Sequence, residues 1–232
     1  SAEAHAVTAL IGPNGAGKTT LFNLITGQIV PGTGLVRFNG VEITRFTPQA
    51  RVHLGVGRTF QDVRLFHNMS VAENIILGMQ RLRGEGLAEA LFLPWAVRGE
   101  LRRAYRRATE LLERVGLVRF ADELAGNLSY GQQKLVAIAR LLAAEPEILL
   151  LDEPTSGVDP RMLSELVAFL EKLRDSGRTV LLIEHNLDIV RLVATQCAFM
   201  ESGRVLRVGS TEDILSDSEL VNKYLGLGTV NG

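Results

Sequence analysis

The fold is decided by one stretch near the start of the chain, Gly12-Pro13-Asn14-Gly15-Ala16-Gly17-Lys18-Thr19. The stretch satisfies the pattern G-x-x-x-x-G-K-[ST], and it joins an apolar run at 7–11 to a helical run at 20–26. Strand, glycine loop and helix in this order predict a loop whose backbone N–H groups wrap a phosphate. We expect Lys18 to contact the β and γ phosphates of a nucleotide and the Thr19 hydroxyl to bind Mg²⁺, with Thr20 among the binding residues. The alternative is an ordinary glycine-rich turn before a helix.

A second candidate anion site follows far along the chain, in Leu128-Ser129-Tyr130-Gly131-Gln132-Gln133. Ser129 is a good helix N-cap, Gly131 allows a ligand to approach the backbone, and the residues from Gln132 to Ala144 have helical composition. Free amide N–H groups and the positive end of a helix dipole would therefore collect here. Because the first loop is already complete, we infer that this second site meets a phosphate held by another copy of the protein.

Two acidic residues end an aliphatic run of the chain. The run at 148–151 has the continuous apolar character of a parallel strand covered on both faces, and Asp152 and Glu153 follow it. Ligands of open α/β sheets bind at the carboxyl ends of the strands, so both carboxylates are expected at the site. Asp152 would hold Mg²⁺ through its water shell, and Glu153 would orient or deprotonate the attacking water. Alone, an Asp-Glu-Pro turn could merely end a strand.

Two further side chains complete a hydrolytic set. A second buried-strand run at 179–183 delivers Glu184 and His185 to the same edge of the sheet, where an imidazole can bond the γ-phosphate or the attacking water. Gln61 follows the residues 57–60, and its amide can bind Mg²⁺ and fix a water. Taken singly, a histidine at a strand end and a glutamine in a loop are both consistent with a structural role.

The order of these motifs resembles that of the nucleotide-binding subunit of an ABC transporter, over nearly the whole chain. The set comprises the loop at 12–19, Gln61, the signature at 128–133, Asp152-Glu153, the residues 156–159 and His185. The resemblance implies an α/β fold with a P-loop NTPase core and a smaller helical lobe, ATP and Mg²⁺ as cofactors, and ATPase activity.

The same resemblance implies an assembly. Two subunits would form a head-to-tail sandwich, in which each ATP lies between one subunit's phosphate loop and the other's Ser129, Gly131 and Gln132. Residues 156–159 would then form the loop by which the two sites communicate. Without the family, the same stretch predicts only a turn into a helix capped by Asp159, with Pro160 at its first position.

Several stretches look most like the ATP-binding subunits of branched-chain amino acid importers. They are 57–61, the tyrosine form of the signature at Tyr130, 182–186, 224–226 and a long segment near 83–107. This likeness implies transmembrane permease subunits as partners, a solute-binding protein indirectly, and a place on the cytoplasmic face of the membrane reached through the permease. It constrains the solute weakly, so urea, amides and other polar solutes remain open, as does a homodimer against a pair of close paralogues.

Two other classes of protein share parts of the pattern. A soluble ABC protein that acts on ribosomes or nucleic acid usually carries two cassettes or a long coiled-coil insertion, and this chain shows neither. A phosphate-loop kinase or GTPase would leave the signature at 128–133 unexplained.

The resemblance departs at the start of the chain. Family members carry a longer segment before the phosphate loop, including a strand and an aromatic residue that stacks on adenine, whereas Ser1 lies eleven residues before Gly12. That strand and that aromatic residue therefore have no counterpart to assign. Either the chain is a piece of a longer polypeptide or the nucleotide base is held less firmly.

We expect one cassette of two lobes, with a core lobe of about 1–61 and 145–232 and a helical lobe of about 62–144. The 232 residues, 46% hydrophobic and 22% charged, are ordinary for a globular protein. Charged residues interrupt the most hydrophobic region near 140–147, so no stretch suits a bilayer span. The net charge of −1 argues against nucleic acid as the main partner. Cys197, the single cysteine, is expected to pack as a small core residue.

Local signals predict further helices. Ser70 and Glu73 form a capping box for a helix reaching about Gln80, and Ser210 can cap a helix that begins at Thr211. A helix from about 100 to 115 ends at a glycine and has an arginine-rich face, with Arg98, Arg102, Arg103, Arg106 and Arg107. That face is either solvated or placed near anionic lipid or an acidic patch of a membrane partner. The apolar groups at 63–69 fit core packing or, by the resemblance, a groove for a cytoplasmic helix of the membrane subunit.

Overall fold

The computed structural model describes residues 3–60, 62–79, 94–218 and 220, with the side chains of 94–97 left aside. Its contacts divide the chain into two compact units. The core unit takes in the described residues of Ser1–Gln61, Pro146–Ser156 and Leu170–Gly232, and the helical unit those of Asp62–Glu145 and Gly157–Phe169. The stretch 157–169 thus belongs with the helical unit, whereas the sequence placed it in the core lobe.

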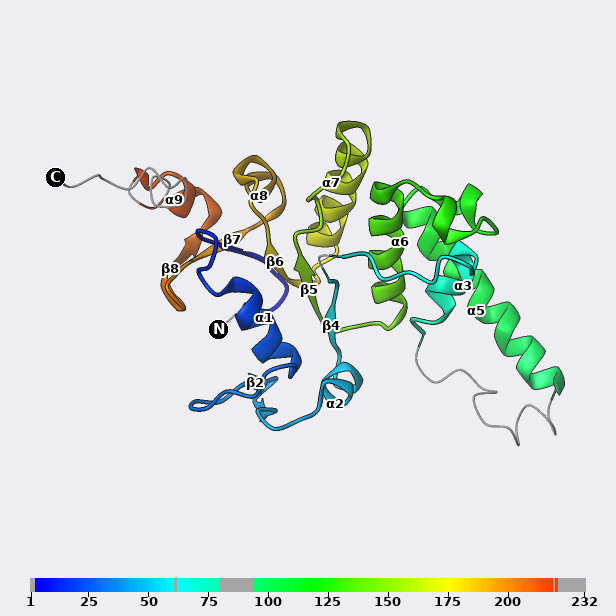
Figure 1. Ribbon diagram of the computed structural model, residues 1–232, viewed down its shortest axis with the longest axis horizontal. Helices are drawn as coiled ribbons and strands as arrows, with labels where there is room; N and C mark the ends of the chain where they lie inside the picture. Colours follow the sequence, from blue (N-terminus) through cyan, green and yellow to red (C-terminus); the bar gives the residue numbers. More distant parts are fainter. Residues whose placement is uncertain (1–2, 61, 80–93, 219, 221–232) are drawn as a thin grey trace. The chain divides into compact units, whose positions relative to one another are not determined.

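The core unit is built on a six-stranded sheet of order β4-β5-β6-β1-β7-β8 (Figure 1). Its strands are β1 (Val7–Ile11), β4 (Val56–Arg58), β5 (Ile148–Asp152), β6 (Thr179–Ile183), β7 (Gln196–Glu201) and β8 (Arg204–Ser210). All neighbouring pairs are parallel except β7 and β8, and a separate antiparallel pair is formed by β2 (Arg37–Phe38) and β3 (Val41–Glu42). The expected strands at 7–11, 148–151 and 179–183 are confirmed, and the fold is α/β.

The register of the sheet brings three strand ends to one edge. Leu10 and Asp152 both pair with Ile183, so β1, β5 and β6 finish at nearly the same level. The residues that follow these strands are Gly12, Glu153 and Glu184. Because the strands are parallel, the phosphate loop and both acidic strand ends lie along the same carboxyl edge.

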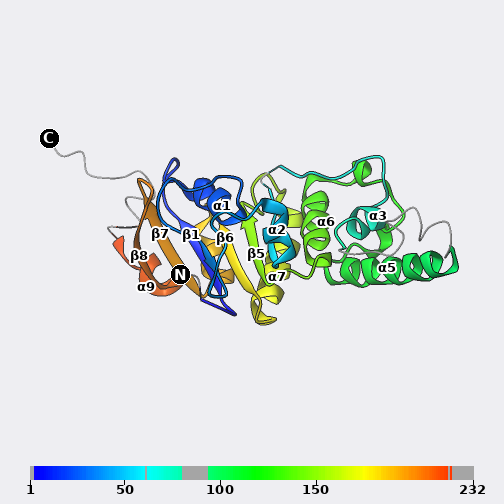
Figure 2. The same ribbon diagram turned by 90° about the horizontal axis from the view of Figure 1, so that it is seen from below.

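Helix α1 (Lys18–Thr26) packs on the sheet directly after the phosphate loop (Figure 2). Phe22 is fully buried in a cluster with residues of β1, β4, β5, β6 and β7, so one aromatic side chain fixes the helix to the sheet. The helix ends at Gly27, whose φ of 78° permits the left-handed turn. It begins at Lys18, two residues before the expected start.

A buried arginine closes the other end of α1. Arg51 comes from α2 (Pro48–His53), and its exposed fraction is 0%. The guanidinium donates to the carbonyl oxygens of Leu24 and Ile25 at 2.6 and 2.7 Å and to that of Thr44 at 2.8 Å. The carbonyl groups of Leu24 and Ile25 lie in the last turn of α1, at the negative end of the helix dipole, so the Arg51 cation stabilises that end of the helix.

The remaining helices of the core unit start at caps that the sequence predicted in part. Asp159 accepts from the backbone N–H groups of Arg161 and Met162 at the start of α7 (Pro160–Asp175), a helix that continues from the helical unit into the core unit. Ser210 caps α9 (Thr211–Leu215), as expected. Asn186 caps α8 (Leu187–Val193).

The helical unit consists of α3 (Val71–Ile76), α5 (Pro94–Arg114), η1 (Val118–Phe120), η2 (Ala125–Asn127), α6 (Tyr130–Ala143) and the first part of α7. Helix α5 buries Ala104, Ala108, Leu111 and Leu112, which recur at helical spacing, and its end is followed by Gly116 with φ 74°. The helix was expected from about residue 100 and begins earlier, at Pro94.

Helix α3 is shorter than expected. Its capping box is present, since Ser70 Oγ accepts from the Glu73 N–H at 3.2 Å and Glu73 Oε2 accepts from the Ser70 N–H at 2.8 Å. The helix ends at Ile76. The Leu77 N–H still bonds the carbonyl group four residues back, but the N–H groups of Gly78 and Met79 bond those three residues back. A Cβ at Gly78 would lie 2.1 Å from the Arg140 carbonyl oxygen, so the chain turns tightly where it crosses α6. Gln80, the expected end, lies outside the described residues.

The loop before α3 is held by one buried amide. Asn74 is fully buried, and its Nδ2 donates to the carbonyl oxygens of Phe66 and Ser70 at 3.0 Å while its Oδ1 accepts from the Phe66 N–H at 2.8 Å. Phe66 itself is 56% exposed, and Leu65 and Met69 are half-buried. This ordered apolar loop therefore leaves Phe66 on the surface.

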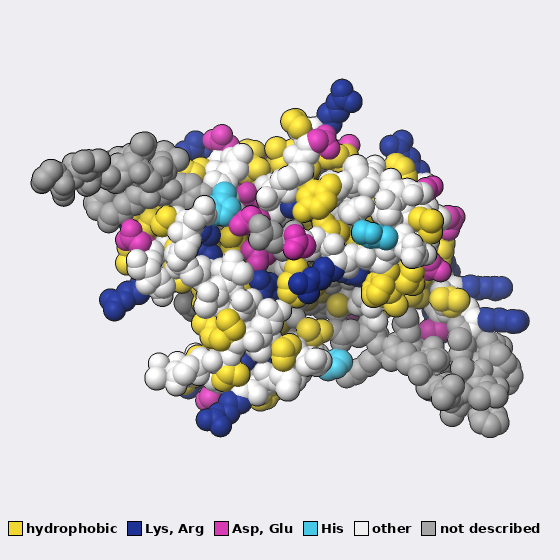
Figure 3. Space-filling view, viewed as in Figure 1, with side chains coloured by type: hydrophobic (Ala, Val, Ile, Leu, Met, Phe, Trp, Pro, Cys, Tyr) yellow, Lys and Arg dark blue, Asp and Glu magenta, His cyan; other side chains and the backbone are white. Residues whose placement is uncertain are grey.

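The arginine-rich face of α5 is partly paired. Arg103 contacts Glu100 at 3.1 Å and Arg107 pairs with Glu145, while Arg98, Arg102 and Arg106 are exposed. Lys and Arg side chains project from the surface in Figure 3 along the part of the molecule that α5 forms. Among the described residues, no helix combines the length and apolar character needed to cross a membrane.

Candidate functional site

The phosphate loop encloses the ammonium group of Lys18. Lys18 is 6% exposed, and its Nζ donates to the carbonyl oxygens of Gly12 and Pro13 at 2.7 and 2.9 Å. Burial lowers the pKa of Lys18, and the nearby carboxylates of Glu153 and Asp152 oppose that shift. A buried cation close to two carboxylates has the electrostatics of a site for a polyanion with a metal.

Glycines are required where the loop meets β7. Gly12 has φ 149°, and a Cβ there would lie 2.0 Å from the Met200 carbonyl oxygen. Gly17 has φ 96° and faces the end of the Met200 side chain at 3.2 Å. Gly15 has φ 79° but nothing within 4 Å of its Cβ position, so it is needed for conformation only. One side of the loop is thus packed, while Asn14, Gly15 and Thr19 are exposed.

Asp152 is held by a residue that the sequence did not single out. Asp152 is 4% exposed, and its Oδ2 accepts from Arg58 at 2.7 Å. Its backbone N–H contacts Thr59 Oγ1 at 3.2 Å. The other carboxylate oxygen, Oδ1, is buried and has no hydrogen-bond partner among the described residues. A buried charged oxygen without a partner costs stability, which fits a group that a metal's water shell would satisfy.

Glu153 and His185 contact each other directly. Glu153 Oε1 lies 2.8 Å from His185 Nε2, and the exposed fractions of the two side chains are 17% and 39%. Glu153 has φ 48°, an uncommon value for a residue with a side chain, and its N–H donates to the Ile183 carbonyl oxygen at 3.0 Å. The two candidate catalytic groups thus meet at the carboxyl edge of β5 and β6, as predicted.

Glu184 has a structural part to play beside them. It is 3% exposed, accepts from Thr155 Oγ1 at 2.6 Å and accepts from the N–H groups of His185 and Asn186 at 3.0 and 3.3 Å. This carboxylate therefore ties the end of β6 to the turn after β5 and fixes the backbone that carries His185. Thr155 was missed, because a threonine two residues after Glu153 carries no signal of its partner.

Gln61 was predicted to bind Mg²⁺ and lies outside the described residues. Just before it, the Thr59 N–H donates to the Leu150 carbonyl oxygen at 2.9 Å, which holds this segment on β5. The prediction for Gln61 therefore stays a prediction.

The signature begins helix α6 with a complete capping box. Ser129 Oγ accepts from the Gln132 N–H at 3.3 Å, and Gln132 Oε1 accepts from the Ser129 N–H at 2.9 Å. Ser129 is exposed and Gln132 is half-buried. The N-cap prediction is confirmed, and the backbone N–H of Gln132 donates to Ser129 Oγ, so it is one of the N–H groups at this helix end that the cap already bonds.

Gly131 has a packing role that the sequence did not suggest. Gly131 is buried, and a Cβ there would lie 2.9 Å from the Met162 Cβ and 3.1 Å from Val158 Cγ1. Packing against the segment that leads into α7 therefore requires glycine, and the expectation that Gly131 lets a ligand approach stays a prediction. Tyr130 lies against the same segment, since a Cβ at Gly157 would be 3.2 Å from its ring.

The candidates divide between the two units. The loop at 12–20, Asp152, Glu153 and His185 belong to the core unit, and Ser129, Gly131 and Gln132 belong to the helical unit. Within the core unit, the register of the sheet and the contact between Glu153 and His185 bring the candidates to one edge.

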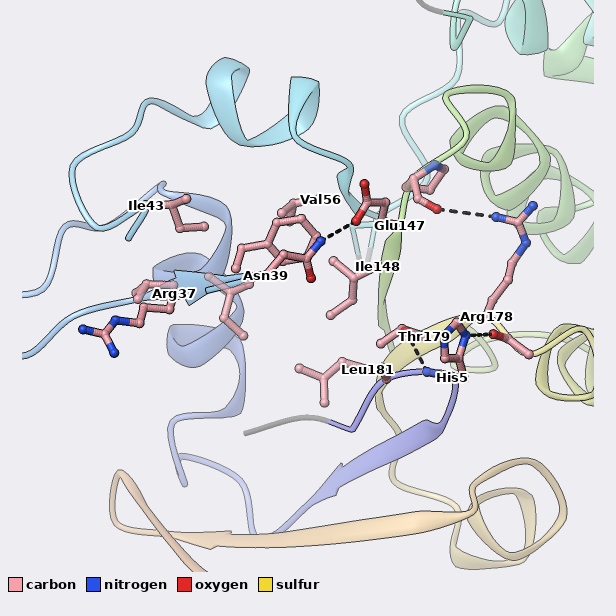
Figure 4. Close-up of a pocket in the computed structure, with 16 residues that line it drawn as sticks. His5, Arg37, Asn39, Ile43, Val56, Glu147, Ile148, Arg178, Thr179 and Leu181 are labelled. Carbon is pink, nitrogen blue, oxygen red and sulfur yellow. Dashed lines mark hydrogen bonds between the residues drawn. The ribbon is translucent and has the colours of Figure 1, made fainter. Parts of the chain in front are cut away.

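A cavity of about 640 Å³ lies at the opposite edge of the same sheet (Figure 4). It is lined by Ile148 and Thr179, the first residues of β5 and β6, and by apolar side chains such as Val56 and Leu181. Its polar groups bond one another, as in the contact of Asn39 with Glu147 at 2.6 Å and that of His5 with the Gly177 carbonyl oxygen at 2.8 Å. No candidate site residue that the structure describes lines it, so this cavity is distinct from the described part of the phosphate site.

Comparison with known proteins agrees with this geometry. The family model described as ABC transporter matches residues 1–156. The high-affinity branched-chain amino acid transport ATP-binding protein BraF of Pseudomonas aeruginosa is 40% identical over 225 residues, which cover 97% of this chain and 88% of BraF.

Two solved structures extend the comparison. The ADP conformation of MJ1267, an ATP-binding cassette of an ABC transporter, matches with a TM-score of 0.80 and 36% identity, covering 97% of this chain and 89% of that one. A dimeric post-hydrolysis state of the cassette MJ0796, bound to ADP and Pi, matches with a TM-score of 0.74 and 27% identity, covering 91% of this chain and 88% of that one.

Proposed function

The chain belongs to the ABC transporter family, and on this premise we propose that it is the ATP-binding and ATP-hydrolysing subunit of an importer for branched-chain amino acids or a related polar solute. One observation carries the proposal: the phosphate loop, Asp152 and the pair of Glu153 and His185 lie at or just beyond the ends of strands that finish at one edge of the sheet. The name of BraF supports the choice of solute.

The donors present fit Mg²⁺ as the companion of the nucleotide. Asp152 Oδ1 is a buried carboxylate oxygen with no partner among the described residues, and hard oxygen donors are what this ion prefers. Asp152, Thr19 and Gln61 are the residues proposed to hold it. Bound with the phosphates, the ion would neutralise charge that develops on them during transfer.

The phosphate loop supplies the binding of ATP. We assign the backbone N–H groups of the loop at 12–20 to the phosphates, with Lys18 as the fixed positive charge. The carbonyl groups that now accept from Lys18 Nζ hold it in the loop, so the cation is in place before the nucleotide arrives. This preorganisation favours a bound polyphosphate.

Glu153 and His185 act on the water. We assign to the Glu153 carboxylate the task of orienting the attacking water and taking its proton, while the His185 Nε2–H donates to Oε1 and fixes the direction of that carboxylate. The left-handed backbone at Glu153 and the buried Glu184 keep this pair in place. Transfer of a proton to a fixed base is the step that the chain's own residues provide.

The signature acts in a second subunit. Ser129, Gly131 and Gln132 are proposed to meet the phosphates held by a partner cassette in a head-to-tail dimer, and the dimeric MJ0796 structure supports dimerisation in such cassettes. Because Ser129 and Gln132 are bonded to each other in the single chain, closure of the dimer would exchange bonds of the capping box for bonds to phosphate. The subunit would couple this closure to permease subunits in the membrane, with a solute-binding protein acting indirectly and no nucleic acid involved.

The ordered apolar loop before α3 is the proposed contact for the permease. Phe66 is exposed while Asn74 fixes the backbone around it, and Leu65 and Met69 are half-buried beside it. A rigid loop that presents an aromatic side chain suits a helix-in-groove contact. This contact would hold the chain at the cytoplasmic face of the membrane.

The main test measures phosphate release by the purified chain with ATP and with GTP. We expect hydrolysis of ATP and loss of nucleotide binding in Lys18→Ala, while Lys172→Ala, on the exposed side of α7, should bind as the wild type does. Equal nucleotide binding by Lys18→Ala would contradict the assignment of the loop.

The dimer is tested separately by size exclusion with ATP. Glu153→Gln should slow hydrolysis and accumulate the closed dimer, and adding Ser129→Arg should remove that dimer because a bulky cation replaces the N-cap. An equally stable ATP-dependent dimer in the double variant would exclude a shared site at the signature. Co-purification with ribosomes in place of membrane proteins would favour the alternative of a cassette that does not serve transport.

A further inference from the structure

Arg58 occupies half of the Asp152 carboxylate, and none of the roles proposed above uses it. The two side chains are 7% and 4% exposed, and Arg58 contacts Oδ2 at 2.7 Å. The opposite oxygen, Oδ1, is the one left without a partner among the described residues. The same carboxylate therefore has one oxygen fixed by a cation and one oxygen available.

The guanidinium of Arg58 is fixed by its other neighbours. Its second nitrogen donates to Asn23 Oδ1 of α1 at 2.6 Å. The ring centroids of Phe22 and Phe60 lie 5.4 and 5.2 Å from the guanidinium carbon, within the range of cation–π contact. Contacts with α1, β5 and the residue Phe60 hold the Arg58 side chain, which is 7% exposed, so its charge stays beside Asp152.

A permanent positive charge at this place acts against any cation that Asp152 binds. Two like charges separated by several ångströms still repel each other appreciably in a protein, where the effective dielectric constant is about 20 and well below that of water. In the absence of a metal, the arginine also pairs with the buried carboxylate through Oδ2, which reduces the penalty of an isolated buried charge. One residue would thus stabilise the empty site and weaken the occupied one.

We propose that Arg58 is a positioning residue, the built-in counter-ion of Asp152, which orients the carboxylate through Oδ2 and lowers the affinity of the site for the divalent ion that accompanies the nucleotide. The inference rests on the proposed function of this site. Its consequence is that the ion stays exchangeable between turnovers, although the carboxylate that receives it is buried.

The test measures Mn²⁺ binding to the ADP complex, by the electron paramagnetic resonance signal of free Mn²⁺, in the full chain. ADP avoids turnover, so the readout is binding and not activity. Arg58→Gln removes the charge, and we expect Mn²⁺ to bind roughly threefold to thirtyfold more tightly because the repulsion is gone. Arg58→Lys keeps the charge and should bind Mn²⁺ within about twofold of the wild type. A purely structural role predicts no gain in either variant.

A second variant covers the case in which Arg58→Gln fails to fold. Asn23→Asp keeps the arginine and places a competing carboxylate on its second nitrogen, so it should also tighten Mn²⁺ binding, by a smaller factor. Arg174→Gln is the matched control, since Arg174 pairs with Asp175 at the surface of the same unit and should leave Mn²⁺ affinity unchanged.

The outcomes separate the two levels of the proposal. Tighter Mn²⁺ binding in Arg58→Gln or Asn23→Asp, with wild-type affinity in Arg58→Lys, supports the counter-ion. Unchanged or weaker Mn²⁺ binding in the folded variants overturns it and leaves the ATPase proposal standing. A wild-type chain that binds no Mn²⁺ with ADP would overturn the proposed function itself, and this inference with it.

Discussion

The phosphate site of the core unit and the signature of the helical unit were both predicted as anion sites, yet they are built in opposite ways. Beside the phosphate loop, the buried Asp152 carboxylate is paired with Arg58 through one oxygen, and its other oxygen has no partner among the described residues. At the signature, Ser129 and Gln132 bond each other at an exposed helix end. The first region therefore has an acceptor that is free to bind a ligand. The second region would have to break the bonds between Ser129 and Gln132 to bind one.

This difference sets what each region contributes to stability. In the core unit, the oxygen of Asp152 that lacks a partner in the described part of the chain already costs stability. Neutral replacements of the acidic site residues should therefore lower ATP turnover more than they lower the stability of the fold. The signature is a helix cap packed on the segment leading to α7, so its replacements should first harm the fold. Substitutions can therefore tell the two regions apart.

The largest effect is expected from Glu153→Gln. The amide keeps the volume and the contact with His185 but cannot accept the proton of the water, so ATP turnover should fall by ~10²–10⁴. Nucleotide binding and thermal stability should change little. Glu165→Gln, at an exposed position of α7, is the control and should hydrolyse ATP normally. Turnover within about threefold of wild type would mean that Glu153 is not the base.

His185 should matter through Glu153. Since its Nε2 lies 2.8 Å from Glu153 Oε1, His185→Ala should lower turnover by roughly tenfold or more, and His185→Gln should recover part of the loss because its amide can donate. The decisive measurement is the double variant with Glu153→Gln. If the two residues act as one unit, His185→Ala costs little further activity in that background. Fully multiplicative losses would show that His185 works independently.

Gly131→Ala should break the signature by packing. The new Cβ would lie 2.9 Å from the Met162 Cβ, and overpacking of this kind costs roughly 1–3 kcal/mol in the free energy of unfolding. Gly99→Ala is the matched control, because Gly99 lies in α5 with nothing within 4 Å and should gain about 0.5–1 kcal/mol. Chemical denaturation measures both. If Gly131→Ala is as stable as the wild type, packing does not require the glycine, and only the predicted approach of a ligand would account for it.

The smallest effect comes from the caps, and the chain offers two equivalent boxes. Ser129→Ala on α6 and Ser70→Ala on α3 should each lower the free energy of unfolding by about 1 kcal/mol. Only Ser129→Ala should also reduce ATP hydrolysis and ATP-dependent dimer formation. Equal activity in the two variants would indicate that the Ser129 hydroxyl serves the helix and nothing else.

The sequence predicted those parts of the fold in which local pattern and chemistry coincide. The strands at 148–152 and 179–183 are mostly aliphatic, and the predicted acids Asp152, Glu153 and Glu184 stand at or directly after their carboxyl ends. The caps at Ser70, Ser129 and Ser210 were also found, because a serine before a helical run acts within one turn. Such signals need no knowledge of distant residues.

What the sequence missed depends on contacts between distant segments. Arg58 meets Asp152 across 94 positions of the chain, and nothing near residue 58 announces a carboxylate. Helix α3 ends early where Gly78 packs closely on the Arg140 backbone, and Gly131 packs closely on Met162. The stretch 157–169 belongs to the helical unit for the same reason, because its contacts with distant segments of the chain, and not its own sequence pattern, decide the assignment.

The single thiol of the chain lends itself to a different kind of experiment. Cys197 is fully buried in β7, between β1 and β8, and its Sγ contacts Thr211 Oγ1 at 3.6 Å. Burial raises the pKa of this thiol, and the contact with Thr211 offsets only part of that shift, so the reactive thiolate is suppressed in the folded chain. A maleimide can therefore label the protein only when the strands around β7 part. The labelling rate, followed with and without nucleotide, is a clock for how often the centre of the core unit opens.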